Sequence, residues 1–350
     1  MTISAERFRL FLSRSTVIAV LLFCFAAAIG CGAATGRPER VFNGETMGTT
    51  YTVKVVGENN QPLPDNLAGT IQAVLEDVNA KMSTYRPDSE LSRFNQHASQ
   101  TPFPVSPETL EVFRIALEVS RQSGGAFDIT VGPLVNAWGF GPDECSNPPN
   151  EETLAELRTR VGYHYLEIRP EGLVKKRPDL CCDLSAVAKG YAVDRVALAL
   201  DQAGVQHYMA EVGGEVRARG KNASGVPWRI GIERPVAGEL AVQEVIHLSG
   251  LSLATSGDYH NFFIKDGVRY SHTIDPKTGK PITHALASVS VVHASCAWAD
   301  AYATAITVLG PEAGFALALE HHLPAYLIIH DGGTGFIERR TPAFRTLCEP

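Results

Sequence analysis

The sequence lacks an excess of positive charge and, beyond its N-terminus, any long apolar run. Lysine and arginine number 31 against 38 aspartates and glutamates, which gives the 350-residue chain a formal net charge of −7. A general nucleic-acid-binding protein usually carries a basic patch, so nucleic acid is not an expected partner. The absence of a later stretch of about 20 apolar residues excludes a polytopic membrane protein. Hydrophobic residues make up 45% of the chain, which is enough for a sizeable core and argues against intrinsic disorder.

The chain also lacks the short motifs of several large enzyme classes. It has no Walker A phosphate loop and no GxGxxG after a strand, so P-loop and Rossmann folds have no support. GxSxG and HExxH are absent too, which removes the support for an α/β-hydrolase or a metalloprotease of that type. No CxxC or Cys/His metal spacing occurs.

The N-terminus is typical of an export signal. Arg7, Arg9 and Arg14 form a basic region, and the mostly apolar segment 15–29 is too short for a confident membrane span. Small residues then precede Cys31 in a pattern that resembles a bacterial lipobox. Cys31 would be the lipid-carrying first residue of the mature chain, and a plain signal peptide cleaved nearby is the alternative.

These features predict the organisation and location of the chain. Residues 1–30 are expected to be a signal peptide, 31–40 a lipid-anchored tether and 41–350 a single domain, with two lobes as an alternative. The mature protein is expected on the periplasmic side of a bacterial membrane, held by the lipid on Cys31. An exported chain can form disulfides, but the sequence does not assign the pairs. The remaining cysteines are Cys145, Cys181, Cys182, Cys296 and Cys348.

Helical and strand-like patterns mix without strict alternation, which favours an α+β fold. Residues 49–56 alternate between two faces, as a half-buried strand does. An apolar stripe at helical spacing predicts a helix over residues 67–82, with Asp65 as its cap. Further helices are predicted over residues 107–123, with a Ser106 cap, 186–204, with a Ser185 cap, and 296–309.

Polar residues surround the start of the helix expected near residue 185. If Ser185 caps it, free backbone N–H groups and the positive end of the helix dipole face outward, an arrangement that suits a phosphate. Lys189 would add a cation one turn later, and Asp183 could accept hydrogen bonds from a ribose or a base. The alternative is an ordinary capped helix with a surface lysine.

Two more segments carry side chains suited to catalysis. Asp300 and Thr304 lie four residues apart in a helical segment, so their oxygens share one face and suit a hard cation such as Mg²⁺. The alternative is a polar edge on a closely packed helix. His272 precedes a tight turn over residues 275–279 and is a candidate general base, with a structural histidine as the alternative.

Other segments suggest the walls of a pocket. The glycines that begin segment 124–134 would let the backbone approach a planar ligand, with Phe127 beside it. Met47, at the start of the first strand, and Tyr85 could be apolar walls. Ordinary core packing is the alternative for both residues.

Taken together, these segments resemble the ApbE family, the FAD:protein FMN transferases. Nine stretches match the family's motifs in the family's order and span about residues 47–310. They are MGTTY, MSTYRPDSELSRFN, GGAFDITVGPLVNAWGFG, DLSAVAKGYAVDRV, EVGGEVRARG, WRIGIERP, LATSGDY, SHTIDPKTGKPI and ADAYATAITVLG. The resemblance implies a single domain of mixed, largely antiparallel sheets with packed helices.

The resemblance also implies an activity. Such proteins bind FAD and Mg²⁺ and move the FMN half of FAD to a threonine or serine hydroxyl of another protein, releasing AMP. Their acceptors are subunits of membrane redox complexes, and His272 would take the proton from the acceptor hydroxyl. Some members instead hydrolyse FAD, so a Mg²⁺-dependent FAD pyrophosphatase is one alternative. A non-enzymatic, exported flavin-binding lipoprotein is another, and a lipoprotein that binds a different solute is a third.

The resemblance finally assigns residues. Ala186, through its backbone carbonyl, Asp300 and Thr304 would bind Mg²⁺. Ala303 stands where many relatives have a second aspartate, so a site for one metal ion is expected. The residues expected to contact FAD are Met47, Tyr85, Ala126, Phe127, Asp128, Asp183, Lys189 and Ile274.

Overall fold

The structure is a computed structural model that describes residues 37–58, 62–142, 148–236, 241–257, 262–265 and 268–348. All of these residues belong to one unit that begins at Arg37. The predicted signal peptide, Cys145 and Cys31, which is predicted to carry a lipid, lie outside the described residues.

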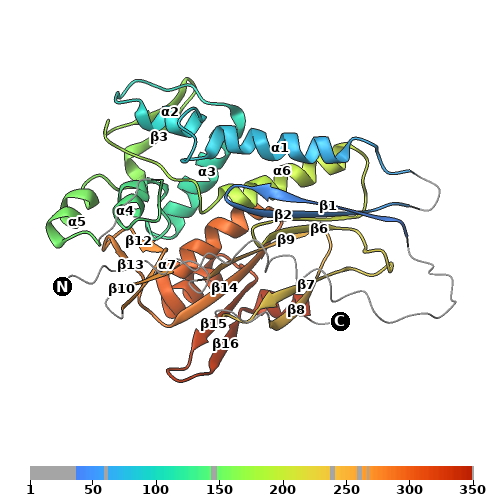
Figure 1. Ribbon diagram of the computed structural model, residues 1–350. Helices are drawn as coiled ribbons and strands as arrows, with labels where there is room; N and C mark the ends of the chain where they lie inside the picture. The colour runs from blue at the N-terminus through green and yellow to red at the C-terminus, as the bar shows by residue number, and fades with distance from the viewer. Residues whose placement is uncertain are drawn as a thin grey trace, which may run out of the picture. The chain divides into compact units, whose positions relative to one another are not determined.

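An eight-stranded sheet forms the centre of the fold (Figure 1). Every pair of neighbouring strands is antiparallel, and the order across the sheet follows the order along the chain. This arrangement confirms the predicted α+β fold with a largely antiparallel sheet. The strands are β1 (Glu39–Thr46), β2 (Thr49–Val56), β5 (Tyr208–Val212), β6 (Glu215–Arg219), β9 (Leu251–Gly257), β14 (Leu286–His293), β15 (Ala325–His330) and β16 (Phe336–Arg340).

Long helices pack on one side of this sheet and on one another (Figure 1). They are α1 (Leu67–Met82), α3 (Pro107–Gln122), α6 (Ala188–Gln202) and α7 (Cys296–Glu320). Helix α7 lies on β9 and β14, α6 packs against α7 and β5, and α1 packs against α6. The main hydrophobic core fills the space between these helices and the sheet.

Shorter elements complete the described chain. The helices are α2 (Glu90–Gln96), α4 (Gly132–Ala137), α5 (Glu151–Arg158) and α8 (Pro342–Cys348), with 3₁₀ turns η2 (Ile129–Val131) and η3 (Tyr163–Tyr165). Small antiparallel pairs join β3 (Leu166–Arg169) to β4 (Gly172–Lys175), β7 (Trp228–Glu233) to β8 (Val242–Leu248), β10 (Phe262–Lys265) to β11 (Val268–Ser271), and β12 (Ile274–Asp275) to β13 (Lys280–Pro281). The β7–β8 hairpin and α8 form a second core with the sheet, in which Trp228 and Phe344 are buried together with Tyr326 of β15.

The apolar stripe of residues 67–82 forms α1 as predicted, but the helix cap is different. The residue before α1 is Asn66, and no side chain caps the helix, so the predicted Asp65 cap is wrong. Helix α3 follows the sequence pattern closely, since Ser106 accepts a hydrogen bond from the Thr109 N–H and Pro107 occupies the first turn.

Helix α6 begins two residues later than predicted, at Ala188, and Ser185 does not cap it. The Ser185 N–H instead donates to Asp183 Oδ1 at 2.7 Å, which forms a local turn before the helix. Val187, with φ of −149°, lies outside the helical region and directly precedes the first helical residue. The Asp183 carboxylate therefore competes with the helix for the backbone of this segment.

Helix α7 breaks at Gly310, where the predicted helix ends, and a second helical segment that was not predicted continues it to Glu320. Among the described residues, α7 is the one helix long and apolar enough to cross a membrane, by length and composition alone. Half of its most apolar window is buried inside the protein, as in the core helix of a globular domain.

Candidate functional site

The first turns of α6 and α7 meet at a glycine. A Cβ on Gly190 would lie 2.4 Å from the Cys296 carbonyl oxygen and 2.8 Å from Asp300 Cβ, so this position requires glycine. The Gly190 N–H donates to Asp300 Oδ2 at 3.0 Å. This bond brings Asp300, which is 4% exposed, to the chain segment that contains the predicted residues Asp183, Ala186 and Lys189.

This contact leaves the Ala186 carbonyl open. In a regular α-helix the Gly190 N–H would donate to the carbonyl of Ala186, four residues earlier. Here that N–H donates to Asp300, and no other backbone N–H in the described part of the chain donates to Ala186. The Ala186 carbonyl thus lacks a backbone donor among the described residues, while the buried Asp300 carboxylate accepts the N–H that a regular helix would have directed to it.

Thr304 lies one helical turn after Asp300, on the same face of α7, and is half-buried. The described residues hold no group of three or more His, Cys, Asp or Glu that could bind a metal. A carbonyl, a carboxylate and a hydroxyl are nevertheless the oxygen ligands that Mg²⁺ accepts, and Mg²⁺ usually keeps several waters as well. The residues present therefore fit the predicted magnesium site.

A buried charge cluster surrounds Asp300. Lys189 Nζ lies 3.0 Å from Glu215 Oε1, and Glu215 Oε2 has no hydrogen-bond partner among the described residues. Burial raises the pKa of Glu215, and the charge of Asp300 raises it further, against the attraction of Lys189. Burial lowers the pKa of Lys189, but Asp300 and Glu215 outweigh this effect and raise it overall. Lys189 therefore stays cationic between two acidic side chains.

The β1–β2 turn reaches this cluster. A Cβ on Gly213, in the turn between β5 and β6, would lie 2.8 Å from Thr49 Cγ2 and 3.0 Å from Lys189 Cδ. Met47 occupies the two-residue β1–β2 turn with φ of 51°, a left-handed conformation that is uncommon outside glycine, asparagine and aspartate. Such strain is typical of functional positions. The hairpin whose turn contains Met47 thus approaches Lys189 through Thr49.

The glycine-rich segment adjoins Asp183 through its backbone, because the Asp183 N–H donates to the Ile129 carbonyl at 2.7 Å. Phe127 is 2% exposed, and Ala126 is buried as well. Asp128 accepts hydrogen bonds from the N–H and hydroxyl of Thr130 and from the Tyr163 N–H, all at 2.7–2.8 Å. The Asp128 side chain thus holds this loop in shape, although burial raises its pKa.

Three aromatic residues, Tyr85, Phe140 and His272, lie in sequence from the exposed surface of the site inward. Tyr85 is 66% exposed, and its hydroxyl donates to the Phe140 carbonyl at 3.3 Å. Partial burial of its hydroxyl and the charge of Asp183 raise the pKa of Tyr85. The Phe140 ring meets the His272 ring edge-on, with centroids 6.4 Å apart.

His272 lies in the short connection between β11 and β12 and is half-buried. Ile274, two residues later, is buried against Leu134 and Trp138. The Trp138 indole N–H donates to the Gly279 carbonyl at 2.8 Å, which fixes the β12–β13 hairpin against α4. This packing connects His272 and Ile274 to the glycine-rich segment, since α4 begins within it.

Sequence reasoning missed three residues of this arrangement. Gly190 makes the α6–α7 contact, Glu215 holds Lys189, and Phe140 lies between Tyr85 and His272. Each occurs inside a stretch quoted for the family resemblance, but a motif match does not say which residue of the stretch makes a long-range contact. The Gly-Gly pair before Glu215 was the one local signal of a tight approach.

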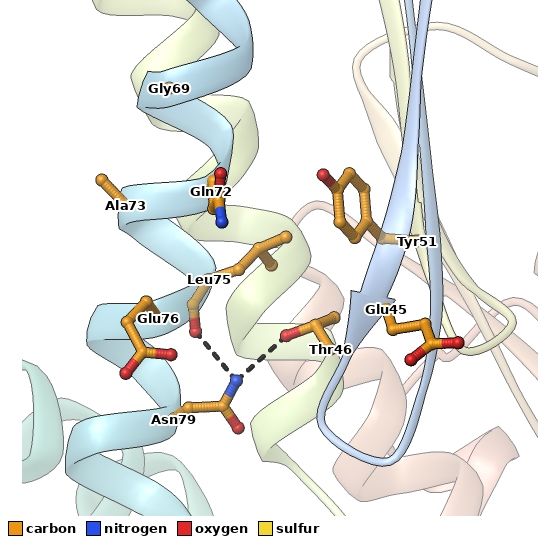
Figure 2. A pocket seen from close by; sticks show the side chains of 9 residues that line it. All are labelled: Glu45, Thr46, Tyr51, Gly69, Gln72, Ala73, Leu75, Glu76 and Asn79. Carbon is orange, nitrogen blue, oxygen red and sulfur yellow. Dashed lines mark hydrogen bonds between the residues drawn. The ribbon is translucent and has the colours of Figure 1, made fainter.

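A separate groove opens beside the β1–β2 turn (Figure 2). It has a volume of about 450 Å³ and lies between the β1–β2 hairpin and α1. The Asn79 amide donates to Thr46 Oγ1 at 3.0 Å and to the Leu75 carbonyl at 3.2 Å, so it ties the two walls together (Figure 2). The predicted site residues do not line this groove, although Thr46 is the neighbour of Met47.

The cysteines near the site are structural. Cys182 and Cys296 are buried and form no disulfide, and burial raises the pKa of both thiols well above the ordinary value. The backbone of Cys182 exchanges two hydrogen bonds of 2.8 Å with the Asn95 side chain. These contacts indicate a structural role for Cys182.

Comparisons with known proteins agree with this geometry. The model of the ApbE family matches residues 47–327. A FAD:protein FMN transferase of Vibrio cholerae is 46% identical over 304 residues, which cover 87% of this chain and 91% of the relative. One from Haemophilus influenzae is 44% identical and covers 88% and 91% of the two chains.

Solved structures show the same fold. The flavin transferase ApbE from Vibrio cholerae superposes with a TM-score of 0.83 at 45% identity, covering 89% of this chain and 99% of the other. The apo flavinyl transferase ApbE of Pseudomonas stutzeri gives a TM-score of 0.81 at 40% identity, covering 89% and 98%. The family match and these identities over most of both chains show that this chain belongs to the ApbE family.

Proposed function

We propose that this protein is a FAD:protein FMN transferase, which moves the FMN half of FAD to a threonine or serine hydroxyl of an acceptor protein and releases AMP. Relatives that carry this name are 46% and 44% identical to it along nearly their whole length. The observation that carries the proposal is the hydrogen bond from the Gly190 N–H to Asp300, which leaves the Ala186 carbonyl without a backbone donor in the described part of the chain. These oxygen ligands suit a hard cation next to the helix start and Lys189.

The diphosphate of FAD is an anion that resists attack by a neutral hydroxyl, so its charge must be neutralised first. Mg²⁺ fits Ala186, Asp300 and Thr304, and when bound there it would supply that neutralisation for the diphosphate. The positive charge of Lys189 neutralises part of the remaining negative charge of the diphosphate, and Glu215 fixes the Lys189 ammonium in place.

The other predicted residues bind and orient FAD. Tyr85, which is largely exposed, offers a ring face to a planar group, and Asp183 accepts hydrogen bonds near it. Met47 closes the pocket from the β1–β2 turn. The buried set Ala126, Phe127, Asp128 and Ile274 shapes the pocket from behind, with Asp128 acting through the loop that it holds.

His272 takes the proton from the acceptor hydroxyl. The hydroxyl oxygen attacks the phosphorus of the FMN half, a new P–O bond forms, and the bond to the AMP phosphate oxygen breaks. The proton goes to a His272 ring nitrogen and AMP leaves with the bonding electron pair. General-base assistance of this kind is typically worth about 10²–10⁴-fold in rate.

The acceptor we propose is a subunit of a membrane redox complex with an accessible threonine or serine. A lipid on Cys31 would hold the enzyme at the periplasmic face of a bacterial membrane, near such an acceptor. Residues 1–30 would be removed as a signal peptide, residues 31–40 would form the tether, and residues 41–350 would carry the activity.

The test is incubation with FAD, Mg²⁺ and a threonine-bearing acceptor peptide, followed by mass spectrometry. Transfer adds the mass of an FMN group to the peptide and produces AMP in equal amount. Free FMN and AMP with an unmodified peptide would instead identify a FAD pyrophosphatase. FAD that stays intact and bound in Mg²⁺ would identify a flavin-binding lipoprotein, and the absence of bound flavin would point to a binding protein for another solute.

A further inference from the structure

Helix α7 breaks shortly after the proposed metal ligands. Gly310 has φ of 79° and ψ of −177°, and Pro311 follows it. In a continuous helix, the N–H of residue 311 would donate to the Thr307 carbonyl, but proline has no N–H. Thr307 is 1% exposed, so its carbonyl needs a partner from within the protein.

His284 supplies that partner. Its Nε2 lies 2.7 Å from the Thr307 carbonyl oxygen, and its Nδ1 accepts a hydrogen bond from the Leu286 N–H at 3.3 Å. Because a backbone N–H can only donate, Nδ1 is the acceptor, and Nε2 carries the proton that is donated to Thr307. The ring packs so closely on Gly310 that a Cβ there would lie 2.9 Å from His284 Cδ2.

The hydrogen bond joins two parts of the site. On one side, His284 follows the β12–β13 hairpin, which begins two residues after His272. On the other side, Thr307 lies three residues after Thr304 and about two helical turns after Asp300. The contact therefore connects the segment of the proposed base with the half of α7 that bears the proposed metal ligands.

We infer that His284 is a positioning residue, which holds the first half of α7 in register with the hairpin next to His272. The inference rests on the proposed function, since the register matters only if these groups act on one substrate. A misplacement of reacting groups by about 1 Å can cost about 10²-fold in rate. Loss of the His284 bond therefore slows transfer much more than it weakens FAD binding.

Two conservative variants separate the roles of the two ring nitrogens. His284→Gln places an amide N–H near the Nε2 position and keeps the donor to Thr307. His284→Asn is shorter, keeps an acceptor for the Leu286 N–H and loses the donor. Gly310→Ala is a third variant, which displaces the ring without removing either nitrogen. His322→Asn is the matched control, because His322 is exposed and has φ of 52°, a conformation that asparagine accepts.

The measurements are kcat and the KM for FAD in the acceptor-peptide assay, FAD affinity by quenching of flavin fluorescence, and thermal unfolding, all in the full chain. We expect His284→Asn and Gly310→Ala to lose at least 10-fold in kcat, with FAD affinity within 3-fold of wild type. His284→Gln and His322→Asn should stay within 3-fold of wild type in kcat.

Equal kcat losses in His284→Asn and His284→Gln would overturn the inference, and so would an unchanged kcat in His284→Asn. A loss of FAD affinity as large as the loss in kcat would also overturn it. If neither His284→Asn nor Gly310→Ala folds, the bond is a folding determinant and the positioning role is wrong. A wild-type protein that transfers no FMN would instead refute the proposed function, so the two failures are distinguishable.

Discussion

Replacing Gly190 by alanine tests the contact that builds the site. The new Cβ would lie 2.4 Å from the Cys296 carbonyl oxygen, so α6 and α7 must move apart. Overpacking of this kind costs about 1–3 kcal/mol. Separation also breaks the Gly190 N–H bond to Asp300, and a hydrogen bond to a charged group is worth about 1.5–3 kcal/mol. The better helix propensity of alanine offsets about 1 kcal/mol, which leaves an expected net loss of about 1.5–5 kcal/mol in the free energy of unfolding.

Urea unfolding of the two proteins measures this loss, and Gly69→Ala is the matched control. Gly69 is exposed within α1, and a Cβ there would meet only the end of the Asn66 side chain, which can rotate away. That substitution should stabilise the protein by about 0.5–1 kcal/mol. A Gly190→Ala protein that is as stable and as active as wild type would refute the proposed role of the α6–α7 contact.

The other predictions concern chemistry and pH. Asp300→Ala should lose Mg²⁺-dependent transfer by at least about 10²-fold, and an unchanged rate at low Mg²⁺ would refute the metal assignment. His272→Ala should keep FAD affinity while transfer slows by about 10²–10⁴-fold; if FAD binding is lost instead, His272 is a ligand contact. Burial raises the pKa of Glu215 from 4.5 to about 8, so the native state keeps a proton that the unfolded state releases, and stability should fall as pH rises between these values. Glu215→Gln should flatten this decline in urea unfolding measured from pH 5 to pH 8, and an unaltered slope would contradict it.

Local chemistry made some elements predictable. The spacing of apolar residues in α1 and the Ser-Pro start of α3 act within a few residues, so the sequence alone specified both helices. The same reasoning failed at Ser185, because the Asp183 carboxylate offered the backbone a turn that competes with the helix cap. Two short-range rules conflicted there, and the sequence did not reveal which would prevail.

The site itself depends on contacts between distant parts of the chain. The bond from Gly190 to Asp300 joins residues 110 positions apart, and the tight α6–α7 packing that creates it comes from the whole fold. Motif order suggested that these stretches belong to one site, but it did not identify Gly190 as the junction. Neither did it show that Glu215 would be the buried partner of Lys189.

The most direct test of the account is a crystal structure of the protein with FAD and Mn²⁺, which replaces Mg²⁺ and gives an anomalous signal. One anomalous peak is expected within about 2.0–2.3 Å of the Ala186 carbonyl oxygen, an Asp300 oxygen and Thr304 Oγ1, with the FAD diphosphate against it. A peak coordinated by other residues, or a diphosphate bound away from Asp300, would contradict the account.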